Sequence, residues 1–476
     1  MYSGDIMANS STTTRLSEGS VVGQLIRFAI PLLLSNLIQS VYNVADMLIV
    51  GRFCGTASIS GVNIGGQLTF FMTNAIFGLC IGGSIIIGQY FGARQDGKVK
   101  STIATLLTFL IYCAVFFTCL MLIFAKTFLT WLNTPVESYG EALRYLRVTA
   151  CGTIFIFGYN AFSCILRGMG NSRQPMKYVM ISCITNIILD VIFVGPLGLA
   201  AQGAAIATVT AQALSMILCI IYFIRNDFAF DFKLKSFRIH KEDLRELLRV
   251  GIPTMIQNMI SSISFMFLTG MVNTYGVAAS AAVSVVNKLN SFAIMPPIAI
   301  SNSVSSIAAQ CFGAGDVHRA KKTFGIGLLL GWVLALPAFF LFKAIPVQLI
   351  SLFDSDPEMI AAGLRYLTIN LYDYLIVSFL FSTNGFINAT GHTMFTAFNN
   401  ILCSVIIRIP VAYVFGTVMG YGLMGVGAGT PCSTLIGTVI ALAYYFIGSW
   451  KKGMIVQNQG EVDSGISEVG DPPVIE

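Results

Sequence analysis

Charged side chains are scarce in this 476-residue chain, where Asp, Glu, Lys and Arg make up 11% of the residues. An average soluble protein contains about 25%, so this chain has too few charges to cover several soluble domains. Charged residues and histidine are absent from four long runs, at 53–93, 101–125, 250–287 and 409–450. Because about 20 apolar residues cross a bilayer as one helix, the sequence predicts an integral membrane protein with many spans.

Several chemical motifs are also missing. The three histidines (His240, His318 and His392) are isolated in predicted loops, and the eleven cysteines include no Cys-x-x-Cys pair. These absences argue against metal catalysis and against disulfides. There is no Walker A sequence, so we do not expect ATP to drive this protein directly. Residues 1–19 lack the apolar segment of a cleavable signal peptide. We therefore expect no enzymatic activity and no bound cofactor.

Charged or Gly/Pro-rich breaks divide the chain into about twelve helices, which predicts an all-α integral membrane protein. The expected spans are 24–50, 58–91, 100–125, 140–166, 175–195, 202–224, 246–272, 279–312, 323–345, 359–388, 394–416 and 424–449.

The net charge of +6 comes from Lys and Arg residues in short loops, a pattern typical of membrane topology and not of nucleic-acid binding. Every second loop is rich in them, and the long connection at 226–243 is one of these loops. Positively charged loops face the cytoplasm. We therefore expect both termini to be cytoplasmic, in a multi-pass protein of the plasma membrane or the bacterial inner membrane. Arg144, Arg147 and Arg365 are exceptions, at the predicted outer ends of two helices.

Short motifs from the first half of the chain return in the second. Leu-Ile-Arg-Phe-Ala-Ile-Pro31 returns as Leu-Leu-Arg-Val-Gly-Ile-Pro253, and Gln-Tyr-Phe-Gly-Ala93 returns as Gln-Cys-Phe-Gly-Ala314. The motif pairs lie 221–224 residues apart. Six predicted spans in each half make the repeats parallel, a design found in secondary transporters. The expected organisation is an N-terminal tail (1–21), an N-lobe (22–225), a linker (226–243), a C-lobe (244–450) and a C-terminal tail (451–476).

Ionisable residues inside predicted spans point to function, because burying charge in a membrane is costly. In the first half, Asp46 lies one helical turn after Tyr42, and Asp190 lies one turn after Asn186. Thr208 follows a run of small residues that allows close helix packing. We expect these side chains to converge on a pocket of oxygens. Two adjacent carboxylates cannot both ionise cheaply, so the pocket would bind a proton or Na⁺ reversibly.

The second half carries a different set of charges, namely Lys288, Asp373 and Arg408. Lys288 and Asp373 are a plausible ion pair, which would leave Arg408 to bind a carbonyl group or a substrate. Functional and structural roles are equally open for all three residues.

Prolines inside predicted helices mark candidate kinks, since proline removes a backbone hydrogen bond. Pro31 and Pro253 occupy matching positions in the first helix of each half, where each could instead mark a helix start. The adjacent Pro296 and Pro297 fall in the middle of a span, where we expect a bend.

Together these motifs resemble the multidrug and toxic compound extrusion (MATE) transporters. The resemblance covers about residues 22–450 and depends on the repeat, on Pro31, and on Tyr-Asn-Val-Ala-Asp46, Asn-Ile-Ile-Leu-Asp190 and Gly-Ala-Ala-Ile-Ala-Thr208. It implies two six-helix bundles around a V-shaped cavity. It also implies export of cationic or aromatic drugs by alternating access, in exchange for H⁺ or Na⁺.

The resemblance also assigns roles to single residues. Asp46, Asn186, Asp190 and Thr208 match the N-lobe cation site of the DinF-like branch, while Tyr42, Tyr145 and Asn160 match its polar neighbours. The NorM-like branch carries acids on its seventh and eighth helices. This chain has none there, although Asp373 falls where that branch has an acid on its tenth helix. The resemblance therefore favours coupling through the N-lobe.

Two other functions remain open. A flippase for lipid-linked sugars would need several cavity cations for a pyrophosphate, and only Lys288 and Arg408 could serve. An intramembrane aspartyl protease would need a second acid facing Asp373. The expected partners are small organic drugs and membrane lipids, with no nucleic acid, and we expect a monomer.

Overall fold

We analysed a computed structural model, which describes residues 15–132, 134–226, 230, 232–353 and 356–451. These residues form helices and the turns between them, with no β-strand among them. Ten of the described helices are long and apolar enough to cross a membrane, or eleven if α4 and α5 count as one bent span. The predicted all-α membrane fold is thus confirmed. Most of the expected tails, 1–21 and 451–476, lies outside the described residues.

The helices follow one another in two similar series. The first series is α1 (Val21–Phe53), α2 (Thr56–Gly92), α3 (Asp96–Trp131), α4 (Val136–Cys151), α5 (Thr153–Gly168), α6 (Arg173–Val194) and α7 (Ala200–Arg225). The second is α8 (Lys241–Asn273), α9 (Val277–Gly313), α10 (Val317–Ala344), α11 (Pro346–Ser351), α12 (Pro357–Asn370), α13 (Asp373–Ala389), α14 (Thr393–Ile401), α15 (Ile409–Tyr413) and α16 (Leu423–Ile447). Each helix of the first series begins 220–223 residues before a counterpart in the second.

Two expected spans are each divided into two helices. The span predicted at 140–166 is α4 and α5, which meet at 51°. Gly152 lies at this break, where a Cβ atom would come within 2.2 Å of the Val209 side chain. The span predicted at 359–388 is the repeat counterpart, α12 and α13. Neither break carries a run of charged, Gly or Pro residues, so the sequence alone offers no reason to divide these two spans.

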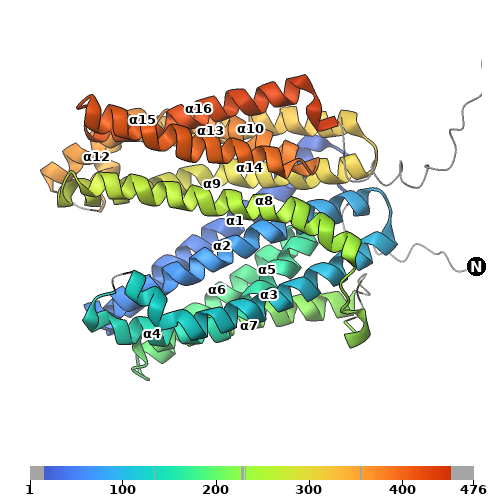
Figure 1. Cartoon of the computed structure of the whole chain (residues 1–476), viewed down its shortest axis with the longest axis horizontal. Coiled ribbons are helices and arrows are strands. Elements are labelled where there is room, and N and C mark those ends of the chain that lie inside the picture. The colour runs from blue at the N-terminus through green and yellow to red at the C-terminus, as the bar shows by residue number, and fades with distance from the viewer. Residues whose placement is uncertain (1–14, 133, 227–229, 231, 354–355, 452–476) are drawn as a thin grey trace, which may run out of the picture.

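Figure 1 shows the two series as two groups of helices, with α1–α7 below and α8–α16 above. We call them the N-lobe and the C-lobe. They meet at the right of the figure, where α2 crosses α8 and α9, and diverge toward the left. Small residues permit this crossing, since a Cβ atom at Gly82 would lie 2.7 Å from the Gly251 Cα atom. The lobes therefore pack closely at one end, which we call the joined end.

Two glutamines connect the lobes at the joined end by reciprocal hydrogen bonds. Gln89 of α2 donates through Nε2 to the carbonyl oxygen of Ala389, at the end of α13 (2.6 Å). Gln310 of α9 donates through Nε2 to the carbonyl oxygen of Gly168, at the end of α5 (2.9 Å). Both glutamines are buried, and each bond satisfies a carbonyl group that its own helix leaves free. The joined end is thus closed by two equivalent contacts.

The prolines expected to kink helices all lie inside continuous helices. Pro31 is inside α1, Pro253 inside α8, and Pro296 with Pro297 inside α9. The alternative that Pro31 and Pro253 begin their helices is wrong, since α1 starts at Val21 and α8 at Lys241. The Ser35 hydroxyl donates to the Pro31 carbonyl oxygen (2.7 Å), a local contact within α1.

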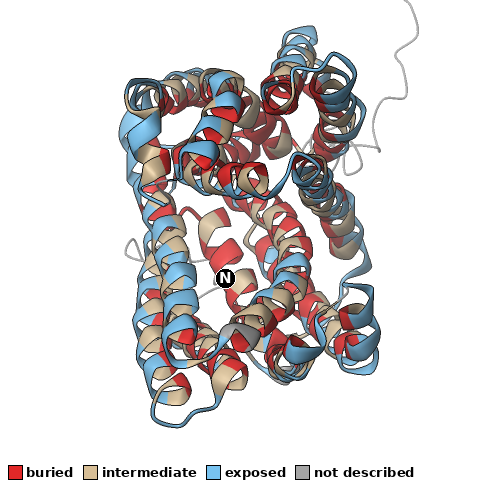
Figure 2. Cartoon of the chain, turned by 90° about the vertical axis from the view of Figure 1, so that its left-hand side faces the viewer, coloured by how far each residue is buried: buried red, intermediate tan, exposed pale blue. Residues whose placement is uncertain are grey.

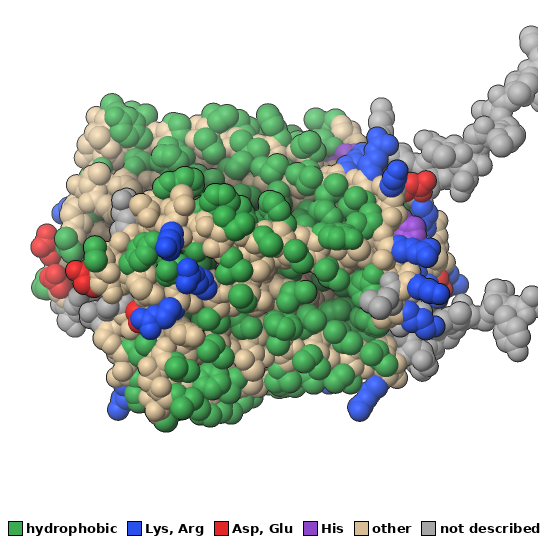
Figure 3. Space-filling view, turned by 60° about the horizontal axis from the view of Figure 1, so that its bottom comes forward, with side chains coloured by type: hydrophobic (Ala, Val, Ile, Leu, Met, Phe, Trp, Pro, Cys, Tyr) green, Lys and Arg blue, Asp and Glu red, His purple; other side chains and the backbone are tan. Residues whose placement is uncertain are grey.

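The outer surface is suited to lipid. Seen from the end opposite the joined end, buried residues line the interior of the helix groups and exposed residues lie outside (Figure 2). Many exposed residues are large and apolar, including Leu48, Phe70 and Ile123. Apolar side chains cover the middle of the molecule in Figure 3, and Lys and Arg side chains gather at its right-hand end, which is the joined end. Lys and Arg side chains also lie left of the centre, and Asp and Glu side chains lie at the left-hand end, so lipid would cover the apolar middle and leave both charged ends in water.

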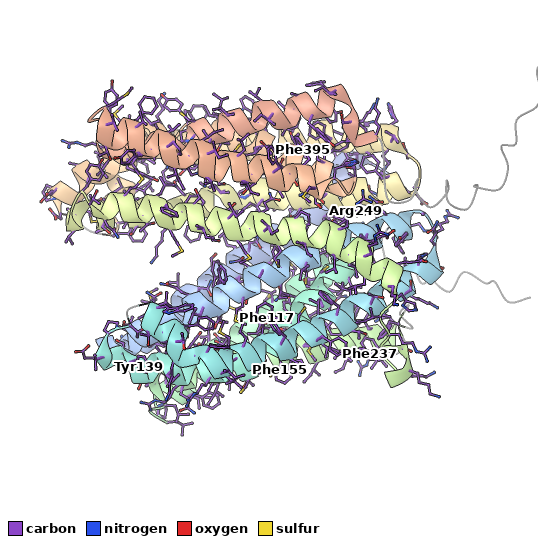
Figure 4. The ribbon with its side chains drawn as sticks, in the orientation of Figure 1. Phe117, Tyr139, Phe155, Phe237, Arg249 and Phe395 are labelled. Carbon is purple, nitrogen blue, oxygen red and sulfur yellow. The ribbon has the colours of Figure 1, made fainter. Side chains whose placement is uncertain are left out.

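The connection between the lobes is more apolar than its charges suggest. Phe230 and Phe232 form edge contacts with ring centroids 5.1 Å apart, and Phe232 packs against Phe162 of α5 (5.9 Å). Phe237, labelled in Figure 4, contacts Phe230 at 5.1 Å. These rings attach the described part of the expected linker 226–243 to the N-lobe.

Candidate functional site

Three helices of the N-lobe place the predicted coupling residues together. Asp46 projects from α1, Asn186 and Asp190 from one face of α6, and Thr208 from α7 beside its small-residue run. Ala204, Ala205 and Ala207 of that run are buried, which brings α7 close to α6. Asp190 and Asn186 are buried, while Asp46 is half-buried. The four residues that sequence analysis selected from three distant segments thus form one cluster.

Hydrogen bonds connect most of this cluster. Tyr42 Oη lies 3.2 Å from Thr208 Oγ1. With its amide nitrogen turned toward Asp190, Asn186 donates to Asp190 Oδ2 (2.9 Å) and accepts from the Thr208 backbone N–H (3.2 Å). This orientation gives both amide atoms of Asn186 a matching partner. The network thus holds Asp190 in place through Asn186.

Two carboxylate oxygens in the cluster have no donor. Asp46 Oδ1 and Asp190 Oδ1 are both buried and lack a hydrogen-bond partner among the described residues. The two carboxyl groups lie within hydrogen-bonding reach of each other. Two carboxylates in such contact repel unless a proton or a cation lies between them. The carboxyl and hydroxyl oxygens of the cluster fit a shared proton or a hard cation such as Na⁺. Among the described residues, no group of three or more His, Cys, Asp or Glu side chains could hold a metal ion.

A small polar pocket extends from this cluster toward the joined end. Its lining includes Tyr42, Asn186 and Thr208, together with Gln39, Ser182 and Gln212. The last three were not predicted from the sequence. Two of them could have been found from their spacing, because Ser182 and Gln212 each lie one helical turn from a predicted site residue and on the same helix face.

The two remaining N-lobe predictions differ in position. Tyr145 of α4 is buried and interacts electrostatically with Tyr42, Asp46 and Asp190, so it belongs to the wall of the site. Asn160 of α5 donates through Nδ2 to the Ile156 carbonyl oxygen of its own helix (2.8 Å). This bond is local, and none of the described hydrogen bonds joins Asn160 to the carboxyl pair.

In the C-lobe, the structure does not support the expected pair of Lys288 and Asp373. Lys288 is exposed on α9, and no ion pair within 4.0 Å joins it to Asp373. Asp373 is buried at the start of α13, where its electrostatic partner is Arg408. The error arose because the spacing along one helix gives no information about which side chain of a distant helix approaches it.

Comparison with known proteins agrees with this geometry. The sequence model of the MatE family matches residues 31–192 and again residues 253–414. The chain is 30% identical over 453 residues to the "Probable multidrug resistance protein YoeA" of Bacillus subtilis, covering 94% of this chain and 97% of the relative. It is 23% identical over 415 residues to the "Multidrug export protein MepA" of Staphylococcus haemolyticus, covering 86% and 90% of the two chains.

Solved structures show the same fold. The chain superposes with a TM-score of 0.86 on the structure titled "Outward-facing conformation of a multidrug resistance MATE family transporter of the MOP superfamily", at 22% identity and covering 93% and 99% of the two chains. The similarity to the DinF-like branch stays a prediction. Two matches to one family model, in register with the two series of helices, show that this chain belongs to the MATE family of membrane transporters.

Proposed function

We propose that this protein exports small organic drugs, including cationic and aromatic ones, in exchange for H⁺ or Na⁺. The names of its relatives support drug export. The proposal that transport is coupled to an ion depends on the contact between Asp46 and Asp190, in which one buried oxygen of each has no hydrogen-bond donor. The ion supplies the positive charge that this pair needs. Drug would move through a central cavity between the lobes.

Alternating access follows from the way the lobes meet. Contacts between α2 and the C-lobe helices α8 and α9 close the joined end, whereas the lobes diverge at the other end (Figure 4). An exporter needs the opposite arrangement at another point of its cycle. We propose that the lobes rock about the crossing helices. Cation uptake at the carboxyl pair would favour one of the two arrangements, because the affinity of the pair depends on its spacing and hydration.

The orientation in the membrane follows from the loop charges. The joined end carries the basic loops and the described ends of the chain, since Arg319 donates to the Leu16 carbonyl oxygen and Lys321 lies over the Trp450 ring. By the positive-inside rule this end is cytoplasmic, so the structure corresponds to an outward-open state. We also propose that the single chain is the working unit within the lipid bilayer, because both lobes and the cation site lie in one chain.

Cysteine labelling tests this orientation. Ser236, in the short helix Leu234–Ser236 between the lobes, should be cytoplasmic. In a background without native cysteines, Ser236→Cys should react with a membrane-impermeant maleimide only after the cells are opened. A cysteine at Val136, which begins α4 at the opposite end and is exposed, should react in intact cells. Equal labelling of Ser236→Cys in intact and opened cells would reverse the assignment.

Reconstitution tests the function itself. In proteoliposomes with the same ethidium concentration inside and outside, an inward gradient of H⁺ or Na⁺ should drive net efflux of the dye and so build up a dye gradient. Collapse of the ion gradient with an ionophore should stop net transport. Dye movement that is unaffected by either ion gradient would refute coupled export.

A further inference from the structure

The C-lobe contains a second group of buried charges that the coupling site does not use. Arg408 ends a π-helical stretch, Leu402–Arg408, a widened geometry that is frequent at functional sites. Its Nε atom donates to Ser433 Oγ (3.2 Å). Its Nη1 atom is buried with no hydrogen-bond partner in the described structure. The guanidinium group therefore has unused donor capacity.

The natural counter-ion of Arg408 is close but does not complete the pair. Asp373 interacts with Arg408 electrostatically, yet no N–O distance between them falls within 4.0 Å. Asp373 Oδ1 is buried and also lacks a partner. A buried cation whose hydrogen bonds are unfilled is unfavourable, and a closer anion would relieve this. Arg408 Nη1 is therefore able to donate to a further acceptor.

An aromatic ring lies over the Arg408 guanidinium. The Arg408 guanidinium lies 4.7 Å from the ring centroid of Phe265 in α8, and this phenylalanine is 46% exposed. Phe265 lies about four helical turns after Gly251 in α8. Because nearly half of its surface is exposed, the Phe265 ring can be reached by a ligand.

The position of the ring is held by bonds between helices. The Ser264 hydroxyl donates to the Ser404 carbonyl oxygen (2.6 Å), and Ser261 Oγ donates to Asn400 Oδ1 (3.0 Å). These bonds fix α8 against the helix that carries Arg408. The ring can therefore stack against a planar ligand while the guanidinium remains within reach of a group on that ligand.

We propose that Arg408 and Phe265 form a binding site for aromatic substrates that carry a carboxylate, with Asp373 as the resident counter-ion that such a substrate replaces. This inference depends on the proposed export function and narrows its substrate class. The guanidinium and a ligand carboxylate would form a charge-assisted hydrogen bond, which is stronger than a bond between neutral groups. A ligand carboxylate should therefore bind roughly tenfold more weakly when Arg408 is removed.

A matched pair of ligands tests the site. A rhodamine dye with a free carboxylic acid and its methyl ester share the same aromatic cation and differ in the carboxylate alone. Fluorescence polarisation would measure binding of each to detergent-purified protein. Arg408→Gln should weaken binding of the acid roughly tenfold and change binding of the ester less than about twofold. Arg408→Lys should recover part of the affinity for the acid, because it retains the charge but not the planar fork.

Asp373→Asn provides the opposite test. Removal of the resident counter-ion should tighten binding of the acid and leave the ester nearly unchanged, which loss of folding cannot imitate. Two results would overturn the carboxylate site. One is an Arg408→Gln variant whose affinity for the acid and for the ester falls equally, and the other is an Asp373→Asn variant that binds the acid more weakly. Ester binding and export by the wild-type protein would still stand in that case. Failure of the wild-type protein to bind either dye would contradict drug export as well.

Discussion

Replacement of Asp46 or Asp190 by asparagine is expected to abolish ethidium efflux from cells while leaving the amount of protein in the membrane unchanged. Asparagine preserves the size of the side chain but cannot hold a proton or neutralise a cation. The pair binds an ion because two carboxyl groups share one small volume, and either single substitution removes the repulsion that an ion relieves. Uptake of the ion would then no longer drive the change between the two states. We expect at least a tenfold loss of efflux rate.

Two other acids serve as controls in the same efflux assay. Glu137, at the exposed start of α4, lies far from the pair in sequence and outside the described site, so Glu137→Gln should retain normal efflux. Asp373→Asn should impair ethidium efflux less than either N-lobe substitution, because its partner is Arg408. Membrane blots would verify equal expression. Wild-type efflux by well-expressed Asp46→Asn protein would disprove the N-lobe coupling site.

A disulfide across the joined end is expected to stop transport completely. A Cβ atom at Gly88 of α2 would lie 3.3 Å from the Cβ atom of Ala309 in α9, close to the roughly 3.8 Å typical of a disulfide. The double variant Gly88→Cys/Ala309→Cys, in a background without native cysteines, should therefore crosslink on oxidation. Because α2 and α9 belong to different lobes, the bond would hold the joined end closed. Efflux should fall to the level of cells without the transporter and return after reduction.

A crosslink within one lobe shows whether transport stops because movement between the lobes is blocked or because any crosslink makes the protein too rigid. A Cβ atom at Gly331 of α10 would lie 3.6 Å from the Cβ atom of Ser378 in α13, and both helices belong to the C-lobe. Oxidised Gly331→Cys/Ser378→Cys protein should transport normally if each lobe moves as a unit. Two outcomes would contradict the rocking model: normal efflux by the fully crosslinked Gly88/Ala309 variant, or equal arrest by both pairs.

Properties that depend on composition, on consecutive residues or on repeated motifs could be predicted from the sequence. The scarcity of charge indicated a membrane protein, and uncharged runs located most helices, because the length and hydropathy of a span are properties of consecutive residues. The motif pairs revealed the repeat because equivalent helices need equivalent residues at their crossings. Asp46 and Asp190 could be selected as well, since an acid on an apolar helix is rare enough to stand out. Asn186 and Thr208 were added by their spacing from Asp190 and from a run of small residues.

Partners across helices were decided only by the tertiary structure. The approach of Asp373 to Arg408 instead of Lys288, and the reciprocal bonds of Gln89 and Gln310, depend on the angles at which helices cross. The division of the tenth predicted span into α12 and α13 likewise is not marked by a run of charged, Gly or Pro residues. Hydropathy predicts which residues are removed from water, but it does not predict which neighbouring helix a side chain faces. Which buried polar groups meet is set by packing between helices, where each must find a partner that the chain order does not specify.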